Sequence, residues 1–260
     1  EVGDDFMIEY RIGGRDPVND PENFNETITF LKAIQDKVDL VHISCGSPRN
    51  DPNFPGLVYP TYLDPMAPNV PYAEAIKQHI TTPVVTGGAI ADPDIAEEII
   101  RQGRADFVAM GRPLVADPHF PNKARQGRKE DIFPCLGCHN CLETMHLTQY
   151  FGCDINPVTG REHRLANLGP AKESKNVVVV GGGPAGMQAA ITAADRGHRV
   201  TLLEASDALG GLLKLTDGDE TKYRLNRYKN FLITQVQKRA IDVRLSCPAA
   251  PEDMEALGAD

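Results

Sequence analysis

The sequence lacks the features of membrane-spanning, exported and nucleic-acid-binding proteins. No apolar run approaches the roughly 18 residues that a membrane span requires, and the opening EVGDDFMIEY has neither the basic nor the apolar segment of a secretory leader. Basic side chains are the minority, with 27 Lys and Arg against 36 Asp and Glu and a formal net charge of −9. Nucleic-acid binding favours clustered basic residues. We therefore expect a cytoplasmic protein with no membrane or nucleic-acid partner.

What remains is the composition of a globular protein. The chain has 260 residues, of which 41% are hydrophobic and 24% are charged. This length accommodates one large domain or two ordinary ones, and this composition is sufficient to bury hydrophobic cores.

The first part of the chain, to about Val115, alternates short apolar runs with helical patterns. The expected strands are FMIEYR (6–11), LVHIS (40–44), PVVTGG (83–88) and DFVAMGR (106–112). Helices are expected over 24–37 and 72–79, and a third opens with Asp92 as N-cap and Pro93 in its first turn. Alternating strands and helices predict an α/β fold with a parallel sheet.

Two of the expected strands run directly into glycines. Gly87 and Gly88 follow one strand, and Gly111 and Arg112 follow the next. Glycine lets backbone N–H groups approach a phosphate closely, and arginine adds a forked donor for its oxygens. Two ordinary tight turns are the alternative. As a consecutive pair, these units suggest the phosphate loops after the last two strands of a (β/α)8 barrel.

Four cysteines follow in a segment rich in Pro, Gly, Asn and His. Cys135, Cys138, Cys141 and Cys153 form the pattern C-x2-C-x2-C-x11-C. Thiols stay reduced in the cytoplasm, so ligation of a soft metal is favoured over disulfide formation. Structural zinc sites usually have two pairs of closely spaced ligands, whereas three close cysteines and a distant fourth favour a 4Fe-4S cluster. A zinc knuckle is the alternative, and the absence of a Cys-Pro ending argues against a two-cluster ferredoxin.

Other candidate ligands near the cluster have simpler interpretations. We expect His139 and His146 to be hydrogen-bonded or solvent-facing rather than metal ligands. Cys45 and Cys247 have no cysteine near them in sequence, and burial as small hydrophobic side chains is expected for both.

A glycine-rich dinucleotide fingerprint, GGGPAG, begins at Gly181. It follows the apolar strand NVVVV and opens a helix expected over 187–196, and Glu204 ends the next strand. Gly183 would allow close approach of a pyrophosphate and Gly186 close packing of helix on strand, while the helix N-terminus attracts the anion. Glu204 would bind ribose hydroxyls and repel a 2′-phosphate, so the site predicts FAD, NAD or ADP rather than NADP. A glycine turn without a ligand is the alternative.

The rest of the chain contains one long helical pattern and one strand. The helix is amphipathic and expected over 223–239, and the strand IDVRL ends at Leu245. No second GxGxxG occurs. A nicotinamide-binding subdomain is therefore expected outside this chain, with the FAD domain cut after its third strand.

Taken in order, these motifs resemble the iron–sulfur branch of the old yellow enzyme family, which includes bacterial 2,4-dienoyl-CoA reductase, 2-enoate reductase and trimethylamine dehydrogenase. The resemblance rests on IEYR, the β-Gly-Gly and β-Gly-Arg-Pro units, CLGCHNCL with a later CDINP, and VVVVGGGPAGM. It implies strands five to eight of an FMN-type TIM barrel over 1–117. A 4Fe-4S linker over 118–172 and the start of a Rossmann-like FAD-binding domain over 173–260 would follow. About half of the barrel is then missing.

The resemblance also implies roles for particular residues. Arg11 would face the FMN pyrimidine and stabilise the reduced anionic flavin, with a barrel-core salt bridge as its alternative. The FMN phosphate loops would be formed by Gly87, Gly88, Gly111 and Arg112. The FAD site would be formed by Gly181, Gly183, Ala185, Gly186, Glu204, Gly210 and Gly211, the last two completing an E-x5-G-G pattern.

No catalytic residue is assigned from the resemblance. The family's proton-donating tyrosine is expected upstream of Glu1. Tyr59 and Tyr62 lie in a Pro-rich loop near the expected substrate side, and we interpret both as loop packing.

The activity implied by the resemblance is an electron relay. NAD(P)H would reduce FAD, and single electrons would pass through the cluster to FMN, which would reduce an activated alkene. The substrate would be a small unsaturated acid, thioester or enone. One alternative is an amine dehydrogenase with reversed electron flow and ADP in place of FAD. Another is an inactive electron-transfer fragment that needs a complementing chain or a homo-oligomer, since half a barrel exposes strand edges.

Overall fold

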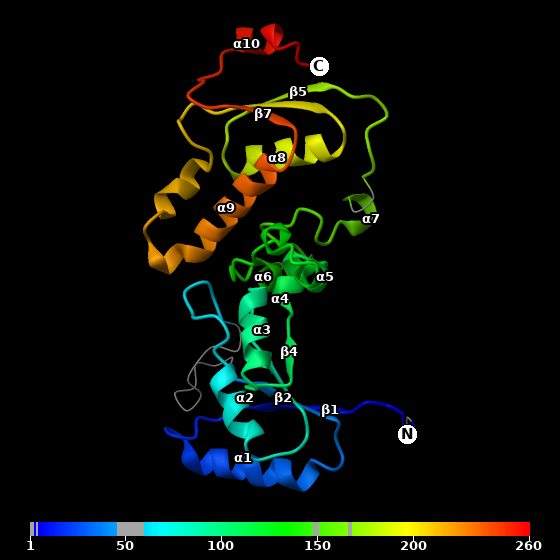
Figure 1. Ribbon diagram of the computed structural model, residues 1–260, viewed down its shortest axis with the longest axis vertical. Helices are drawn as coiled ribbons and strands as arrows, with labels where there is room; N and C mark the ends of the chain where they lie inside the picture. The colour runs from blue at the N-terminus through cyan, green and yellow to red at the C-terminus, as the bar shows by residue number, and fades with distance from the viewer. Residues whose placement is uncertain (1–2, 4, 46–59, 148–150, 166–167) are drawn as a thin grey trace. The chain divides into compact units, whose positions relative to one another are not determined.

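The computed structural model describes residue 3 and residues 5–45, 60–147, 151–165 and 168–260 (Figure 1). The chain divides into two compact units. The first unit contains residues 1–121 and 137–139, and the second contains residues 122–136 and 140–260. Each unit has its own parallel sheet, so the prediction of an α/β fold with parallel sheets is confirmed.

The sheet of the first unit has four parallel strands in sequence order. They are β1 (Glu9–Gly13), β2 (Leu40–Ser44), β3 (Val84–Gly87) and β4 (Phe107–Ala109). The first strand begins later than predicted. Before it, the backbone N–H of Ile8 donates a 2.7 Å hydrogen bond to Asp39 Oδ2, so this N–H bonds to a side chain and not to the backbone of β2. Phe6 and Met7 are exposed and outside the strand.

Helices follow these strands. They are α1 (Pro21–Ile34), α2 (Val70–Lys77), α3 (Pro93–Arg101), α4 (Arg112–Ala116) and α5 (Phe120–Arg125). The predicted start of α3 is confirmed, because the Asp92 side chain accepts a 2.9 Å hydrogen bond from Asp94 N. The first two helices begin two or three residues earlier than predicted. Each has a proline in its first turn, where the missing N–H costs nothing.

Helices cover one face of this sheet. The core between them includes Val41, Ile43 and Val84 from the strands and Leu31 and Ile76 from the helices, all fully buried. A one-residue slip of a strand would turn these side chains to the other face, so their burial fixes the register. The alternate residues of the same strands consequently point to the opposite face.

The sheet of the second unit has three parallel strands. They are β5 (Asn176–Val180), β6 (Arg199–Leu203) and β7 (Ile241–Arg244), in the order β5-β6-β7. Helix α8 (Pro184–Asp195) joins the first two strands, and α9 (Tyr223–Gln237) precedes the third. The 3-10 helices η2 (Gly211–Thr216) and η3 (Glu220–Lys222) lie between β6 and α9, and α10 (Pro251–Ala256) follows β7.

Buried side chains of both helices form the core of the second unit. Met187 and Ala190 of α8, Leu202 of β6 and Leu232 of α9 are fully buried. The long amphipathic helix is thereby confirmed. Helix α8 starts three residues before its predicted start at Met187, since Gly183 occupies the N-cap and a proline follows it.

The cysteine-rich segment contains more regular structure than the sequence predicts. Besides α5, it includes η1 (Lys129–Asp131), α6 (Asn140–Leu147) and α7 (Glu162–Leu165). These helices span three to eight residues, too short to show a clear hydrophobic period. No helix in the described part of the chain is long and apolar enough to cross a membrane.

Candidate functional site

The face of the first sheet opposite helices α1 and α2 carries two rows of side chains. The strand register aligns Arg11 with His42, His42 with Val85, and Val85 with Phe107. One row further along the strands, Gly13 pairs with Ser44 and Gly87 pairs with Ala109. This second row, Gly13, Ser44, Gly87 and Ala109, contains only small residues; we call it the small-residue row. It leaves space at the carboxyl ends of the strands, where parallel α/β folds bind ligands.

His42 is a polar residue of this face that the sequence analysis missed. Its Nδ1 lies 2.6 Å from Glu9 Oε1 on the neighbouring strand. Arg11 is its cross-strand partner and is exposed on the same face. A sequence signal was available, since His42 lies between Val41 and Ile43, both fully buried. A polar residue at this alternate position points away from the helices.

The two predicted phosphate loops lie at the same edge of the sheet. Gly87 ends β3 and pairs with Ala109 of β4, so Gly88 and Gly111 both follow the carboxyl ends of neighbouring strands. A Cβ on Gly88 would lie 2.7 Å from the Nδ2 of buried Asn69, whereas a Cβ on Gly111 would meet nothing within 4 Å. The backbone beside Gly111 is therefore the more open of the two.

Arg112 follows this open glycine and is attached to a neighbouring loop. Its Nη1 donates a 2.7 Å hydrogen bond to the carbonyl oxygen of Pro60, and Nε2 of His139 lies 3.0 Å from the same oxygen. His139 is therefore hydrogen-bonded, as predicted. The His146 side chain and Tyr59 lie outside the described residues. Tyr62 is 41% exposed, which contradicts its assignment to loop packing.

The four cysteines of the C-x2-C-x2-C-x11-C pattern differ in environment. Cys141 is buried, Cys135 and Cys153 are partly buried, and all three belong to the second unit. Cys138 is exposed and belongs to the short segment grouped with the first unit. Within the described residues, no three His, Cys, Asp or Glu side chains are arranged to hold a metal ion. The four-cysteine ligand set therefore stays a prediction.

None of the six cysteines, all of them in the described part of the chain, forms a disulfide. Cys45 is buried, as predicted. Cys247 is only partly buried, contrary to its prediction, because it follows the end of β7, where its backbone N–H donates to the carbonyl of Glu204.

Cys153 has surroundings that suit a metal-bound thiolate. Burial raises the pKa of its thiol, and the nearby Cys135 raises it further. The backbone N–H groups of Ile155 and Asn156 donate hydrogen bonds to its sulfur, which oppose that shift. Hydrogen bonds to sulfur stabilise cluster thiolates and tune their potential. The donor chemistry at Cys153 thus fits a cluster that replaces the proton.

Aromatic side chains of α9 lie near Cys153 in the second unit. Tyr228 is buried, and burial together with the negative charges of Cys153 and Asp154 raises its pKa to about 12. The centroid of its ring lies 6.4 Å from that of Phe231, with the two rings stacked, and the ring centroids of Phe231 and Phe133 are 4.6 Å apart. This aromatic group, which the sequence analysis did not identify, is continuous from the segment before Cys135 to α9. The three-residue spacing of Tyr228 and Phe231, which places both on one face of a helix, was the sequence signal that could have identified it.

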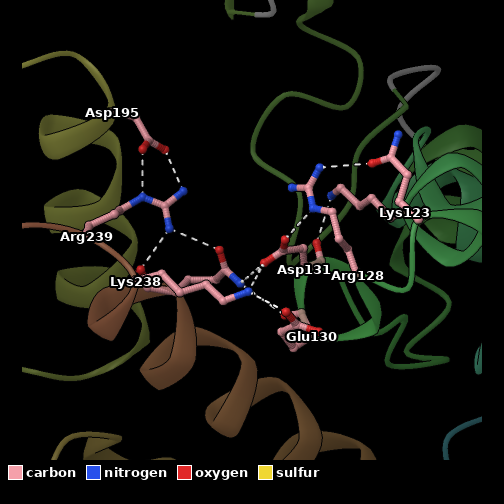
Figure 2. A network of polar contacts seen from close by, with 9 residues as sticks. Lys123, Arg128, Glu130, Asp131, Asp195, Lys238 and Arg239 are labelled. Carbon is pink, nitrogen blue, oxygen red and sulfur yellow. Dashed lines mark hydrogen bonds and ion pairs between the residues drawn. The ribbon is translucent and has the colours of Figure 1, made fainter.

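A polar network also fastens the segment before the cysteines to α9 (Figure 2). Lys238 Nζ lies 2.7 Å from both Glu130 Oε1 and Asp131 Oδ1. Gln235 Nε2 donates to Asp131 Oδ1 at 3.1 Å, and Arg128 Nε donates to Asp131 Oδ2 at 2.8 Å. Burial raises the pKa of Asp131, but the hydrogen bonds from Lys238, Gln235 and Arg128 outweigh it and hold the pKa well below its usual range.

The dinucleotide fingerprint forms the loop between β5 and α8 and the first turn of that helix. Gly181 N donates a 2.7 Å hydrogen bond to the carbonyl of Leu203 on the neighbouring strand. A Cβ on Gly186 would lie only 1.9 Å from Gly181 O, so no other residue fits there without movement of the backbone. Ala185 lies in the same first helical turn, behind the N-cap Gly183.

The structure brings the E-x5-G-G glycines onto the fingerprint loop. Gly210 N donates a 2.9 Å hydrogen bond to Gly182 O. Gly211 has a φ of +53°, and a Cβ on it would lie 2.9 Å from the Cα of Gly183. Two motifs that are separate in sequence therefore form one surface at the N-terminus of α8, where backbone N–H groups favour a phosphate.

Glu204 is fixed beside this surface. Its Oε1 accepts hydrogen bonds from Ser206 Oγ at 2.7 Å and Ser206 N at 2.8 Å, and its Oε2 accepts one from Gly182 N at 2.6 Å. These bonds from Ser206 and Gly182, with the nearby charge of Lys214, lower the pKa of Glu204. Oε2 of the ionised carboxylate accepts only one of these bonds and so retains a lone pair that could accept a ribose hydroxyl.

Two family profiles match the chain. That of the NADH:flavin oxidoreductase / NADH oxidase family matches residues 1–131, and that of the FAD dependent oxidoreductases matches residues 176–239.

Similar proteins include both reductases and dehydrogenases. NADH oxidase of Thermoanaerobacter brockii is 37% identical over 100% of this chain and 40% of its own length. Cinnamate reductase of Clostridium sporogenes is 34% identical over 74% of this chain and 29% of its own length. The N,N-dimethylglycine/sarcosine dehydrogenase of Chromohalobacter salexigens is 33% identical over 96% of this chain and 36% of its own length.

Among solved structures, the complex of 2-naphthoyl-CoA reductase with 2-naphthoyl-CoA is similar to this chain. The TM-score is 0.87 at 31% identity, over 100% of this chain and 39% of the other. The chain thus spans about 40% or less of the length of these proteins.

Proposed function

This chain belongs to the NADH:flavin oxidoreductase / NADH oxidase family of flavin-dependent oxidoreductases, and we propose that the protein reduces an activated carbon–carbon double bond. Electrons from NAD(P)H would reach the substrate by way of FAD, a 4Fe-4S cluster and FMN. The observation that supports this proposal most strongly is that one chain has two parallel sheets, each with a glycine-lined edge. Four cysteines lie between the two edges in sequence.

The first sheet would hold FMN. Gly87, Gly88, Gly111 and Arg112 would surround its phosphate, and Arg11 would carry the positive charge next to its ring. The small-residue row supports this assignment, because larger side chains would fill the carboxyl edge of the sheet. When bound, FMN supplies hydride-transfer chemistry.

The cysteine segment would hold a 4Fe-4S cluster through Cys135, Cys138, Cys141 and Cys153. The N–H donors at the sulfur of Cys153 support this assignment. The aromatic group of Tyr228, Phe231 and Phe133 would exclude water from it. When bound, such a cluster supplies one-electron transfer between two-electron carriers.

The second sheet would hold FAD. Its site comprises Gly181, Gly183, Ala185, Gly186, Glu204, Gly210 and Gly211. The contact of Gly211 with Gly183 supports a shared phosphate-binding surface. Glu204 would orient the ribose and disfavour a 2′-phosphate there. When bound, FAD supplies hydride acceptance from NAD(P)H.

The substrate would be a small unsaturated acid, thioester or enone. Support comes from the similarity to a cinnamate reductase and to a 2-naphthoyl-CoA reductase. The chain would then divide into an FMN part over 1–117, a cluster part over 118–172 and an FAD part over 173–260. Cysteines without disulfides suit a reducing compartment such as the cytoplasm.

The test is cofactor analysis followed by turnover. After anaerobic purification of the holoprotein, we expect FMN, FAD and about four iron and four sulfide per chain. Anaerobic assays with NADH and NADPH should then show reduction of cinnamate, an enoyl thioester or an enone. Zinc without sulfide would overturn the cluster assignment, and absence of FMN would overturn the flavin site of the first sheet.

The second candidate is an amine dehydrogenase. It is favoured by the similarity to N,N-dimethylglycine/sarcosine dehydrogenase over 96% of the chain. Glu204 serves ADP as well as FAD, because both share the ribose and pyrophosphate. Bound ADP in place of FAD, with oxidation of a methylated amine and no alkene reduction, would select this activity.

A further inference from the structure

A histidine–carboxylate pair lies on the same face as Arg11. His42 of β2 donates through Nδ1 to Glu9 Oε1 of β1 at 2.6 Å, across 33 residues of sequence. The side chains are 16% and 41% exposed. Because the carboxylate accepts the hydrogen of Nδ1, the other ring nitrogen, Nε2, carries a lone pair in the neutral imidazole.

The position of Nε2 connects this pair to the predicted flavin site. Nε2 lies 3.4 Å from the point that a Cβ on Gly87 would occupy. Gly87 belongs to the small-residue row at the carboxyl edge. The imidazole ring therefore lies between Glu9, which its Nδ1 contacts, and the small-residue row, which its Nε2 approaches. Nε2 is the ring nitrogen closer to the carboxyl edge of the sheet.

Few charged groups face His42 among the described residues. On β1 they are Glu9, which is bonded to it, and Arg11, which is its cross-strand partner. On β3 the facing residues are Val85 and Gly87, neither of which titrates. Glu9 and Arg11 are thus the charged side chains that share this face with His42. A negative charge added at the carboxyl edge would attract a proton to an imidazole there.

We propose that His42, oriented by Glu9, holds a proton at Nε2 whenever a flavin bound at this edge is reduced. The inference rests on the proposed function, which places FMN here. On reduction, two electrons from the reductant and one proton from water enter the flavin. A second proton from water binds His42 Nε2, and it returns to water on reoxidation.

The test is the pH dependence of the FMN reduction potential in the holoprotein. FMN labelled with ¹³C would separate its infrared signal from that of FAD during an electrochemical titration. Where His42 takes up its proton, between about pH 5 and 8, the equilibrium constant of reduction should change by an additional tenfold per pH unit. This corresponds to about 30 mV for a two-electron couple.

Three variants make the measurement specific. His42→Gln should lose the additional pH dependence, whereas His79→Gln, which removes a histidine of the helical layer, should keep it. Glu9→Gln should keep the dependence but move it to lower pH, because the imidazolium then lacks its carboxylate.

The outcomes separate this inference from the proposed function. If FMN is bound and His42→Gln shows the wild-type pH dependence, the role of His42 is wrong. If His42→Gln does not retain FMN, the test rests on Glu9→Gln. An FMN reduction potential whose pH dependence is not shifted in that variant also contradicts the inference. If the wild-type protein binds no FMN, the proposed function fails instead.

Discussion

At the scale of single residues, the Glu204 carboxylate is held in place by protein donors alone. Three hydrogen bonds from Ser206 and Gly182 fix both oxygens. A ribose that binds there meets an acceptor that is already ionised and oriented. Little ordering is then needed on binding, which favours affinity.

We expect Glu204→Gln to weaken the binding of FAD. A hydrogen bond to a charged group contributes about 1.5–3 kcal/mol, so the dissociation constant should rise about 10- to 100-fold, as measured by flavin fluorescence in the holoprotein. Glu220→Gln, at the start of η3, is the matched control and should bind FAD normally. Unchanged FAD affinity in Glu204→Gln would remove this residue from the site.

The residue scale is also where sequence patterns were least informative. His42 pairs with Glu9 across 33 positions, and Tyr228 lies beside Cys153 only because α9 folds back on the cysteine segment. Neither pair has a local signature, since each depends on which strands or helices become neighbours. Gly186 and Glu204, in contrast, belong to a local strand–turn–helix pattern whose spacing is dictated by one fold.

At the scale of elements, the starts of helices show a common deviation from prediction. Helices α1, α2 and α8 begin two or three residues before their predicted starts, and each has a proline in its first turn. Apolar periodicity marks only the first buried residue, Phe24 in α1 and Met187 in α8. The preceding turn is set by backbone chemistry instead. The strands and the helices α1, α2, α3, α8 and α9 were predictable in existence and order. The first turns of α1, α2 and α8 and the short helices of the cysteine segment were not.

Helix α8 gives a sharp test of the fingerprint. We expect Gly186→Ala to lower thermal stability and FAD content, because the new Cβ would lie 1.9 Å from Gly181 O. Overpacking of this kind costs about 1–3 kcal/mol. Calorimetry and flavin analysis would measure both effects.

The matched control for this substitution is Gly169→Ala, where a Cβ meets nothing within 4 Å. It should retain normal stability and FAD. Equal melting temperatures of the two variants would contradict the close packing of α8 on the fingerprint loop.

Helix α9 gives a test that depends on pH. Asp131→Asn should weaken the attachment of η1 to α9 by about 2 kcal/mol at neutral pH, since it loses charged hydrogen bonds. The folded-state pKa of Asp131 is lowered, so its stabilisation is complete above the unfolded value of about 3.9 and is lost as pH falls below it.

The measurement is the difference in melting temperature between wild type and Asp131→Asn. It should be several degrees at pH 7 and shrink steadily below pH 4. Asp242→Asn is the control, because its side chain is 53% exposed and its ion pair with Arg244 lies on one strand. A difference that stays constant with pH would show that charge is not what holds η1.

At the scale of the whole molecule, the proposed function depends on sites from both units. The family and its flavin chemistry follow from the order of the motifs, from Arg11 to Gly211. The predicted four-cysteine ligand set does not follow from spacing alone, since Cys138 is grouped with the first unit and Cys135, Cys141 and Cys153 with the second.

The electron path can be tested across the whole protein. We expect Cys153→Ser to lose iron and sulfide while FMN and FAD are retained, because a cubane cluster needs four thiolates. NAD(P)H should still bleach FAD, but alkene reduction should fall by at least about 100-fold. Cys247→Ser should behave as wild type. Full alkene reduction by Cys153→Ser would exclude a cluster relay.

The attachment of η1 to α9 also bears on how such proteins can be divided. Residues 122–136 pack with the second unit, although in sequence they follow the first sheet directly. A cut placed immediately before Cys135 would strip α9 of the partners of Gln235 and Lys238. Any exchange of this nucleotide-binding unit between homologues, by recombination or by design, should therefore carry the chain from about residue 122 onward as one inherited piece.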